Sequence, residues 1–176
     1  MSPALYAPFA SSHLPKLIKP IVSLGDAAQL KVRLAQDKKD IRAAQALRYE
    51  VFYKTMGAHS KFRQRLSRID SDRYDSVCEH LLLTTTEKVA KASKKTRLAN
   101  GETVIGCYRL LCRDVAERAG GFCSQNEFDL TPLLNGAGRH LNIVELGRSC
   151  VYPDFRSGKS ISLMWKGLGA FTASQH

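Results

Sequence analysis

The chain has 176 residues, 44% of them hydrophobic and 24% charged, and its 27 Lys and Arg residues outnumber its 16 Asp and Glu residues. This length suits one domain with a single core. No stretch approaches the ~20 consecutive apolar residues that cross a bilayer, which excludes a membrane-spanning protein. The formal net charge of +11 predicts an anionic partner, such as nucleic acid, an anionic membrane, a phosphorylated cofactor or an acidic protein.

The N-terminal segment and the cysteines narrow the class further. Residues 1–29 contain four prolines and lack the continuous apolar core of a secretory signal, so we expect a flexible tail followed by one domain over residues 30–176. Five cysteines without a Cys-x-x-Cys pair disfavour a disulfide framework and a zinc ribbon, and they indicate a reducing cytoplasm. We predict no metal site. With 8% aromatic residues and no basic–aromatic repeats, we expect no nucleic-acid partner.

The first half of the domain has two clear elements. Residues 30–34 alternate apolar and basic side chains, which predicts a half-buried strand. Residues 37–56 form a helical pattern with Asp37 or Asp40 as N-cap and Gly57 after the C-terminus. A polar segment, 57–79, follows as a long loop or short helical turns, and long ordered loops often carry function.

The second half predicts paired strands at 80–86 and 103–111, a helical turn at 114–118, and a loop with a short helix at 122–134. Residues 142–151 are apolar on both faces, which predicts a central strand covered on both sides. The last helix spans 157–174, with an apolar stripe of Ile161, Met164, Trp165, Leu168 and Phe171. This order of elements predicts an α/β (α+β) domain.

Three sets of charged residues are candidates for a functional site. Two of them lie within apolar elements, and the third lies in the polar segment after the first helix. Arg48 lies in the apolar stripe of the first helix, either as a snorkelling side chain or as a buried guanidinium aimed at a carboxylate. Asp72 and Asp75 are either loop-capping residues or anions that hold a cationic amine. Glu145 and Arg148 fall inside the covered strand, where charges need partners. Gly147 between them suggests a bulge that changes the alternation of side chains along the strand. If these charges are structural, the expected arrangement is a core ion pair of Glu145 with Arg48 or Arg109.

The segment 151–160 joins this strand to the last helix. A basic, glycine-containing turn before a helix presents backbone N–H groups and a helix dipole to a phosphate, although Arg156 and Lys159 are equally compatible with solvated loop charges. The segment is not a Walker A loop. No Gly-x-Ser-x-Gly elbow is present, which disfavours a serine hydrolase.

Together, several segments resemble the bacterial ornithine-lipid N-acyltransferases, which are related to the acyl-homoserine-lactone autoinducer synthases within the GNAT superfamily. The resemblance runs from about Leu30 to the chain end. It rests on Leu47–Phe52, Asp72–Asp75, His80–Leu83, Gly106–Leu111 and Val144–Val151, which occur in the family's order.

The resemblance implies a GNAT-like fold with a central mixed sheet between helices, and an active site shared among its motifs. The implied catalytic residues are Arg48, Arg109, Glu145 and Arg148, and the implied acceptor-binding residues are Phe52, Asp72 and Asp75. For the phosphopantetheine of the acyl donor the implied residues are Cys150, Val151, Arg156, Ser157, Gly158, Lys159 and Ser160. Lys159 stands where the usual coenzyme A loop has its first glycine, which suits a donor with a single phosphodiester.

The implied reaction is transfer of a (3-hydroxy) fatty acyl group from acyl carrier protein to the α-amino group of L-ornithine, the first step of ornithine lipid biosynthesis. We expect no bound cofactor, a cytoplasmic protein with peripheral contact to the anionic inner membrane face, and acyl carrier protein as partner. The family's further C-terminal strands have no counterpart here, so we expect a C-terminally truncated acyltransferase.

Two alternatives remain open from the residues. One is another N-acyltransferase, either an autoinducer synthase or an enzyme for a different amino acid. The other is a non-catalytic basic module that binds nucleic acid or an anionic membrane.

Overall fold

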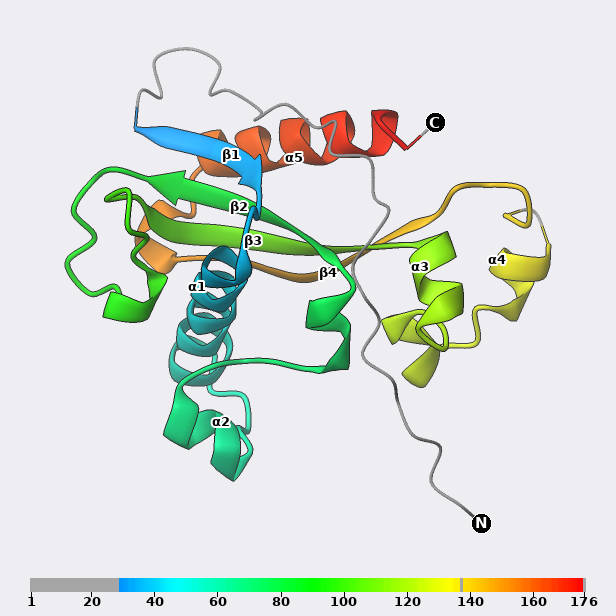
Figure 1. The fold of residues 1–176 in the computed structure, drawn as a ribbon, viewed down its shortest axis with the longest axis horizontal. Coiled ribbons are helices and arrows are strands. Elements are labelled where there is room, and N and C mark those ends of the chain that lie inside the picture. Colours follow the sequence, from blue (N-terminus) through cyan, green and yellow to red (C-terminus); the bar gives the residue numbers. More distant parts are fainter. Residues whose placement is uncertain (1–28, 137, 176) are drawn as a thin grey trace.

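The computed structural model describes residues 29–136 and 138–175 (Figure 1). The expected tail, except for its last residue, lies outside this range. Four strands form one sheet in the order β1-β2-β3-β4. Their bounds are Leu30–Leu34, Glu79–Thr85, Thr103–Cys112 and Val144–Val151. All three strand pairs are antiparallel, so the parallel pairing of a mixed sheet does not occur among the described strands. The expected α/β class and the strand positions are confirmed.

Helix α1 (Lys38–Arg48) covers one face of the sheet. Of the two N-cap candidates in the sequence the structure selects Asp37, whose carboxylate accepts hydrogen bonds from the backbone N–H groups of Lys39 and Asp40. Its buried alanines allow close approach to Leu82 and Cys107 in the sheet. The chain then continues as a π-helix, η1 (Tyr49–Thr55), a form that is frequent at functional sites.

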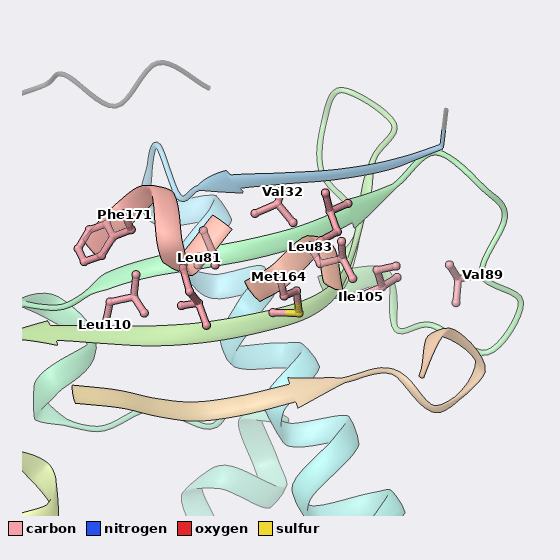
Figure 2. Close-up of a cluster of buried hydrophobic side chains, with 10 residues drawn as sticks. Val32, Leu81, Leu83, Val89, Ile105, Leu110, Met164 and Phe171 are labelled. Atoms are coloured by element: carbon pink, nitrogen blue, oxygen red, sulfur yellow. The ribbon is translucent and has the colours of Figure 1, made fainter. Parts of the chain in front are cut away.

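Helix α5 (Gly158–Ala173) covers the opposite face (Figure 1). Its inward side chains meet those of β1, β2 and β3 in the main hydrophobic core, shown in Figure 2. Gly167 permits this contact, because an added Cβ would stand 2.5 Å from Cγ1 of Val32. The predicted apolar stripe is partly wrong, since Ile161 and Trp165 are exposed. The buried members of the helix are Ser160, Leu163, Met164, Gly167, Leu168 and Phe171.

Strand β4 differs most from its prediction. It pairs with β3 only, among the described residues, and most of its side chains are partly or fully exposed. The expectation of a central strand covered on both faces is therefore wrong for the described part of the chain. The apolar residues of β4 led to this interpretation, yet the side chain of Leu146 is 41% exposed.

Short helices complete the fold. Most of them lie in segments that the sequence predicted to be loops or helical turns. In Figure 1, α3 and α4 lie beyond one end of the strands. Among the described residues, no helix has the length and apolar character to span a membrane. Their bounds are α2 Phe62–Ser67, η2 Arg73–Ser76, η3 Lys94–Thr96, α3 Arg113–Arg118, η4 Cys123–Asn126, α4 Thr131–Asn135 and η5 Pro153–Phe155.

Candidate active site

Arg48 is a buried guanidinium with carboxylate partners, so the second of its two interpretations is confirmed. Its side chain is fully buried and donates two hydrogen bonds of 2.8 Å to the carboxylate of Asp75. It also donates to the backbone carbonyl of Asp70, and its Nε lies 3.0 Å from Oδ2 of that residue. The last turn of α1 is thereby tied to the loop before β2.

Burial and ion pairing act against each other in this pair. Burial raises the pKa of Asp75, but the hydrogen bonds and charge of Arg48 outweigh it and leave that pKa below its ordinary value. Burial lowers the pKa of Arg48, and the same contacts more than reverse the effect. Both groups are therefore charged at neutral pH, and each depends on the other for compensation.

A second ion-pair group lies next to the first and is more open. Arg109 on β3 donates to both carboxylate oxygens of Asp72, at 2.6 and 2.7 Å. Arg148 on β4 donates to Asp72 at 3.2 Å and lies 3.7 Å from Oδ2 of Asp70. Burial raises the pKa of Asp72, but the hydrogen bonds and charges of Arg109 and Arg148 lower it by more. The resulting pKa, about 2, lies below the ordinary value of an aspartate. The side chain of Arg148 is 40% exposed, so this guanidinium is open to a ligand.

A β-bulge in β4 allows Arg148 to face this group. Between the pairs Cys107–Cys150 and Arg109–Gly147, β4 contains one residue more than β3. Arg148 occupies the left-handed region with φ of 51°, and the alternation of the strand shifts there. The predicted bulge is confirmed, and it places Arg148 on the side that carries Arg109.

Glu145 is bound by backbone N–H groups and not by an arginine. Its carboxylate accepts hydrogen bonds from the N–H of Cys123 (2.8 Å), the N–H of Ser124 (3.0 Å) and the hydroxyl of Ser124 (2.7 Å). The alternative of a core ion pair with Arg48 or Arg109 is therefore wrong. Cys123 links the two regions, since Arg109 donates to its sulfur at 2.9 Å.

The remaining expected residues lie around this cluster. Phe52 is partly buried and packs against the hydrophobic cluster beneath α1. At the start of α5, Ser157 is the N-cap and accepts from the N–H of Ser160, while Arg156 and Lys159 are exposed. Cys150 is buried, with its sulfur 3.6 Å from that of Cys107, and Val151 ends β4.

Sequence reasoning missed several partners. Asp70 stands in the same acidic motif as Asp72 and Asp75, so its position offered a signal. Cys123 and Ser124 offered none, because their role depends on how the loop after α3 folds back onto β4. The five thiols are free, and no three metal-ligating side chains cluster in the part of the chain that the structure describes.

An antiparallel sheet between helices, with a bulged strand that leads into a long helix, is the fold of a GNAT-type transferase. Residues 47–166 match the family model described as "Acetyltransferase (GNAT) domain". The chain belongs to this family.

Four curated relatives carry the name L-ornithine N(alpha)-acyltransferase, and three of them compare with the chain as follows. The chain is 37% identical to the one of Brucella abortus over 85% of its own length and 50% of the relative's. It is 41% identical to the one of Rhizobium meliloti, over 84% and 47% of the two chains. It is 37% identical to the one of Rhodobacter capsulatus, over 80% and 50%. The chain thus spans about half the length of these relatives.

The fold is also similar to a solved structure. The crystal structure of the AHL synthase LasI matches 82% of this chain and 66% of that chain, with a TM-score of 0.50 and 18% sequence identity. At this identity the match bears on the fold alone, and it agrees with the GNAT-like architecture that the motifs predicted.

Proposed function

We propose that this chain carries the active site of an L-ornithine N(alpha)-acyltransferase, which transfers a (3-hydroxy) fatty acyl group from acyl carrier protein to the α-amino group of ornithine. The observation that carries the proposal is the convergence of Arg48, Arg109 and Arg148 on three aspartates beside Glu145. The names of the relatives supply the acceptor, and the family supplies the reaction class.

The two ion-pair groups have different tasks in this proposal. Asp75 is buried with both oxygens bonded to Arg48, so the pair holds the loop in place. Asp72 and Arg148 are open to solvent and bear opposite charges. They suit the acceptor, with Arg148 at the carboxylate of the amino acid and Asp72 at its side-chain ammonium.

The reaction forms an amide and breaks a thioester. The neutral α-amino group attacks the thioester carbonyl, the tetrahedral intermediate collapses with loss of the pantetheine thiolate, and a proton leaves the amine. Glu145 removes this proton, directly or through a water molecule. An α-amino group has a pKa of about 7.7–8.0, so a minority of it is neutral at pH 7 and the base has only one proton to remove. Backbone N–H groups at the bulge between Gly147 and Cys150 stabilise the oxyanion.

The donor reaches the site along the end of β4. Its phosphodiester binds the free N–H groups at the start of α5, with Arg156 and Lys159 as flanking charges. Cys150 and Val151 line the path of the pantetheine arm. The net charge of +11 favours an acidic carrier protein, so the Michaelis constant of the donor should rise with salt.

The test is release of free thiol from purified 3-hydroxyacyl carrier protein by this chain, with and without ornithine. Glu145→Gln should lower the rate by about 100-fold or more. Circular dichroism checks that the variant is folded, because the amide loses one of the acceptor oxygens that bind the N–H groups of Cys123 and Ser124. Glu127→Gln, at an exposed position on the loop whose Cys123 and Ser124 bind Glu145, is the matched control. Thiol release that ignores ornithine, or a Glu145→Gln variant at the wild-type rate, contradicts the proposal. Product mass separates a linear acyl-ornithine from a lactone.

A further inference from the structure

Helix α2 exposes its apolar side chains and turns a polar one inward. Phe62 is 72% and Leu66 78% exposed, and none of the helix is buried. Four residues apart, these two side chains lie on one face. Met56, 65% exposed, precedes them in the same segment. A helix that covers a core has the reverse arrangement, so this face is not explained by the fold.

Gln64 on the opposite side of α2 attaches the helix to the rest of the domain. Its amide donates to the hydroxyl of Tyr53 at 2.9 Å and to the carboxylate of Asp70 at 3.3 Å. Asp70 is also a partner of Arg48. These contacts fix which side of α2 faces outward, and they join the helix to the candidate active site.

The segment around this face is purely basic. Residues 54–68 contain no Asp or Glu, and their Lys and Arg side chains are all exposed. Lys54 pairs with Glu50, but no ion pair is seen in the described chain for the other four, which are Lys61, Arg63, Arg65 and Arg68. Lys95 from η3 donates to the carbonyl of Ser67, which brings a further basic segment alongside. Arg63 and Arg65 flank the apolar pair on the helix.

From these features we propose that residues 56–68 dock on the surface of an anionic lipid bilayer. Apolar side chains flanked by arginines match such a surface, where the rings and aliphatic groups enter the acyl boundary and the cations meet phosphate headgroups. In Figure 1, α2 lies past the end of α1 and away from the sheet, so it can touch a plane without obstructing β4. An acidic protein would match the charge but not the exposed Phe62 and Leu66.

This inference extends the proposed function, because an acylated amino acid is itself a membrane lipid. The docking face is joined through Gln64 and Asp70 to the arginines of the site. Contact with the bilayer therefore places the acceptor side of the site next to the compartment that receives the product.

The experiment is co-sedimentation of the purified chain with vesicles of phosphatidylcholine containing phosphatidylglycerol, and with pure phosphatidylcholine vesicles. We expect binding to the anionic vesicles only. Phe62→Ser with Leu66→Ser should lower the partition constant about tenfold or more. Arg63→Gln with Arg65→Gln should also lower it at least tenfold, since each cation near such a surface contributes roughly fivefold. Neither pair should change the melting temperature, because these side chains are exposed.

Matched controls use exposed residues elsewhere. Phe128→Ser with Leu141→Ser removes comparable apolar surface, and Lys38→Gln with Lys39→Gln removes two charges; both should bind like the wild type. Equal binding to neutral vesicles, absence of binding, or equal losses in the controls overturns the proposal. So does binding of acyl carrier protein or a second copy of the chain that depends on Phe62 and Leu66. Vesicle binding needs no substrate, so its failure is distinct from failure of acyl transfer.

Discussion

Replacement of Arg48 by Met tests whether the buried ion pairs hold the site together. The substitution keeps much of the side-chain volume but removes two hydrogen bonds to Asp75, one to the carbonyl of Asp70, and the close approach to the Asp70 carboxylate. Asp75 then remains buried with neutral donors from Gln45 and the backbone of Asp72, and its remaining guanidinium partner is Arg109, 3.6 Å away. Loss of one partner of a buried pair costs about 3–5 kcal/mol.

The loss has a measurable size and a defined pH dependence. At about 2–4 °C per kcal/mol for a domain of this length, the melting temperature at pH 7 should fall by about 6–20 °C. In the wild type, the lowered pKa of Asp75 stabilises the fold above the unfolded pKa of about 3.9 and ceases to do so as the pH falls through the folded value. In the variant, only the weaker contacts that remain act against burial, so the pKa of Asp75 rises above its wild-type value and protonation relieves part of the penalty as the pH falls.

The stability difference between wild type and Arg48→Met should therefore shrink from pH 7 to pH 4. Urea unfolding followed by circular dichroism measures it at each pH. Arg42→Met, exposed on the same helix, is the control and should cost less than about 0.5 kcal/mol. A deficit below about 1 kcal/mol at pH 7, or one that stays constant with pH, would refute the account of Arg48 as the compensating charge.

Three further substitutions or measurements address packing, strain and reactivity. Gly167→Ala should destabilise the fold by about 1–3 kcal/mol in urea unfolding because its Cβ meets Val32, while Gly169→Ala, with nothing within 4 Å, should be neutral or stabilising; equal effects would contradict the packing account. Arg148→Gly should relax the left-handed backbone and leave the melting temperature unchanged or higher, yet lower acyl transfer at least tenfold; a variant with full activity would remove Arg148 from the acceptor site. Burial raises the pKa of Cys78 to about 12, so in titration with a chromogenic disulfide at pH 8 this thiol should react only after unfolding, and rapid reaction in the native state would contradict its burial.

The parts of the fold that could be predicted are those encoded locally. The alternation in 30–34, the Asp37 cap and the paired strands around Leu82 and Cys107 all follow from period and propensity, and the structure confirms them. The charge of Arg48 within an apolar stripe also signalled a buried partner. The sequence left a snorkelling side chain and a buried guanidinium both open for Arg48, and the structure confirms the second, with Asp70 and Asp75 as partners.

The remaining features depend on contacts between distant segments. An apolar strand shows no sign of whether another element covers it, so β4 was predicted to be covered although Leu146 is exposed. Likewise, the sequence offered Arg48 or Arg109 as the partner of Glu145, but the loop after α3 brings two backbone N–H groups to its carboxylate. The sequence therefore predicted that Glu145 needs a hydrogen-bonding partner, but the identity of that partner depends on the tertiary structure.

The bulge in β4 was predicted from the local sequence around Gly147, and its effect depends on contacts with distant residues. In a regular strand Glu145 and Arg148 would point to opposite faces, and Arg148 could not reach Asp72. One extra residue reverses the alternation between them, so the acid that we propose as base and the guanidinium that we propose as anchor share one side of the sheet. The same irregularity removes ladder partners from backbone N–H groups, which an oxyanion can then use. Because one distortion serves base, anchor and oxyanion site, straightening the strand by deletion of Ser149 should abolish transfer more completely than any single side-chain substitution.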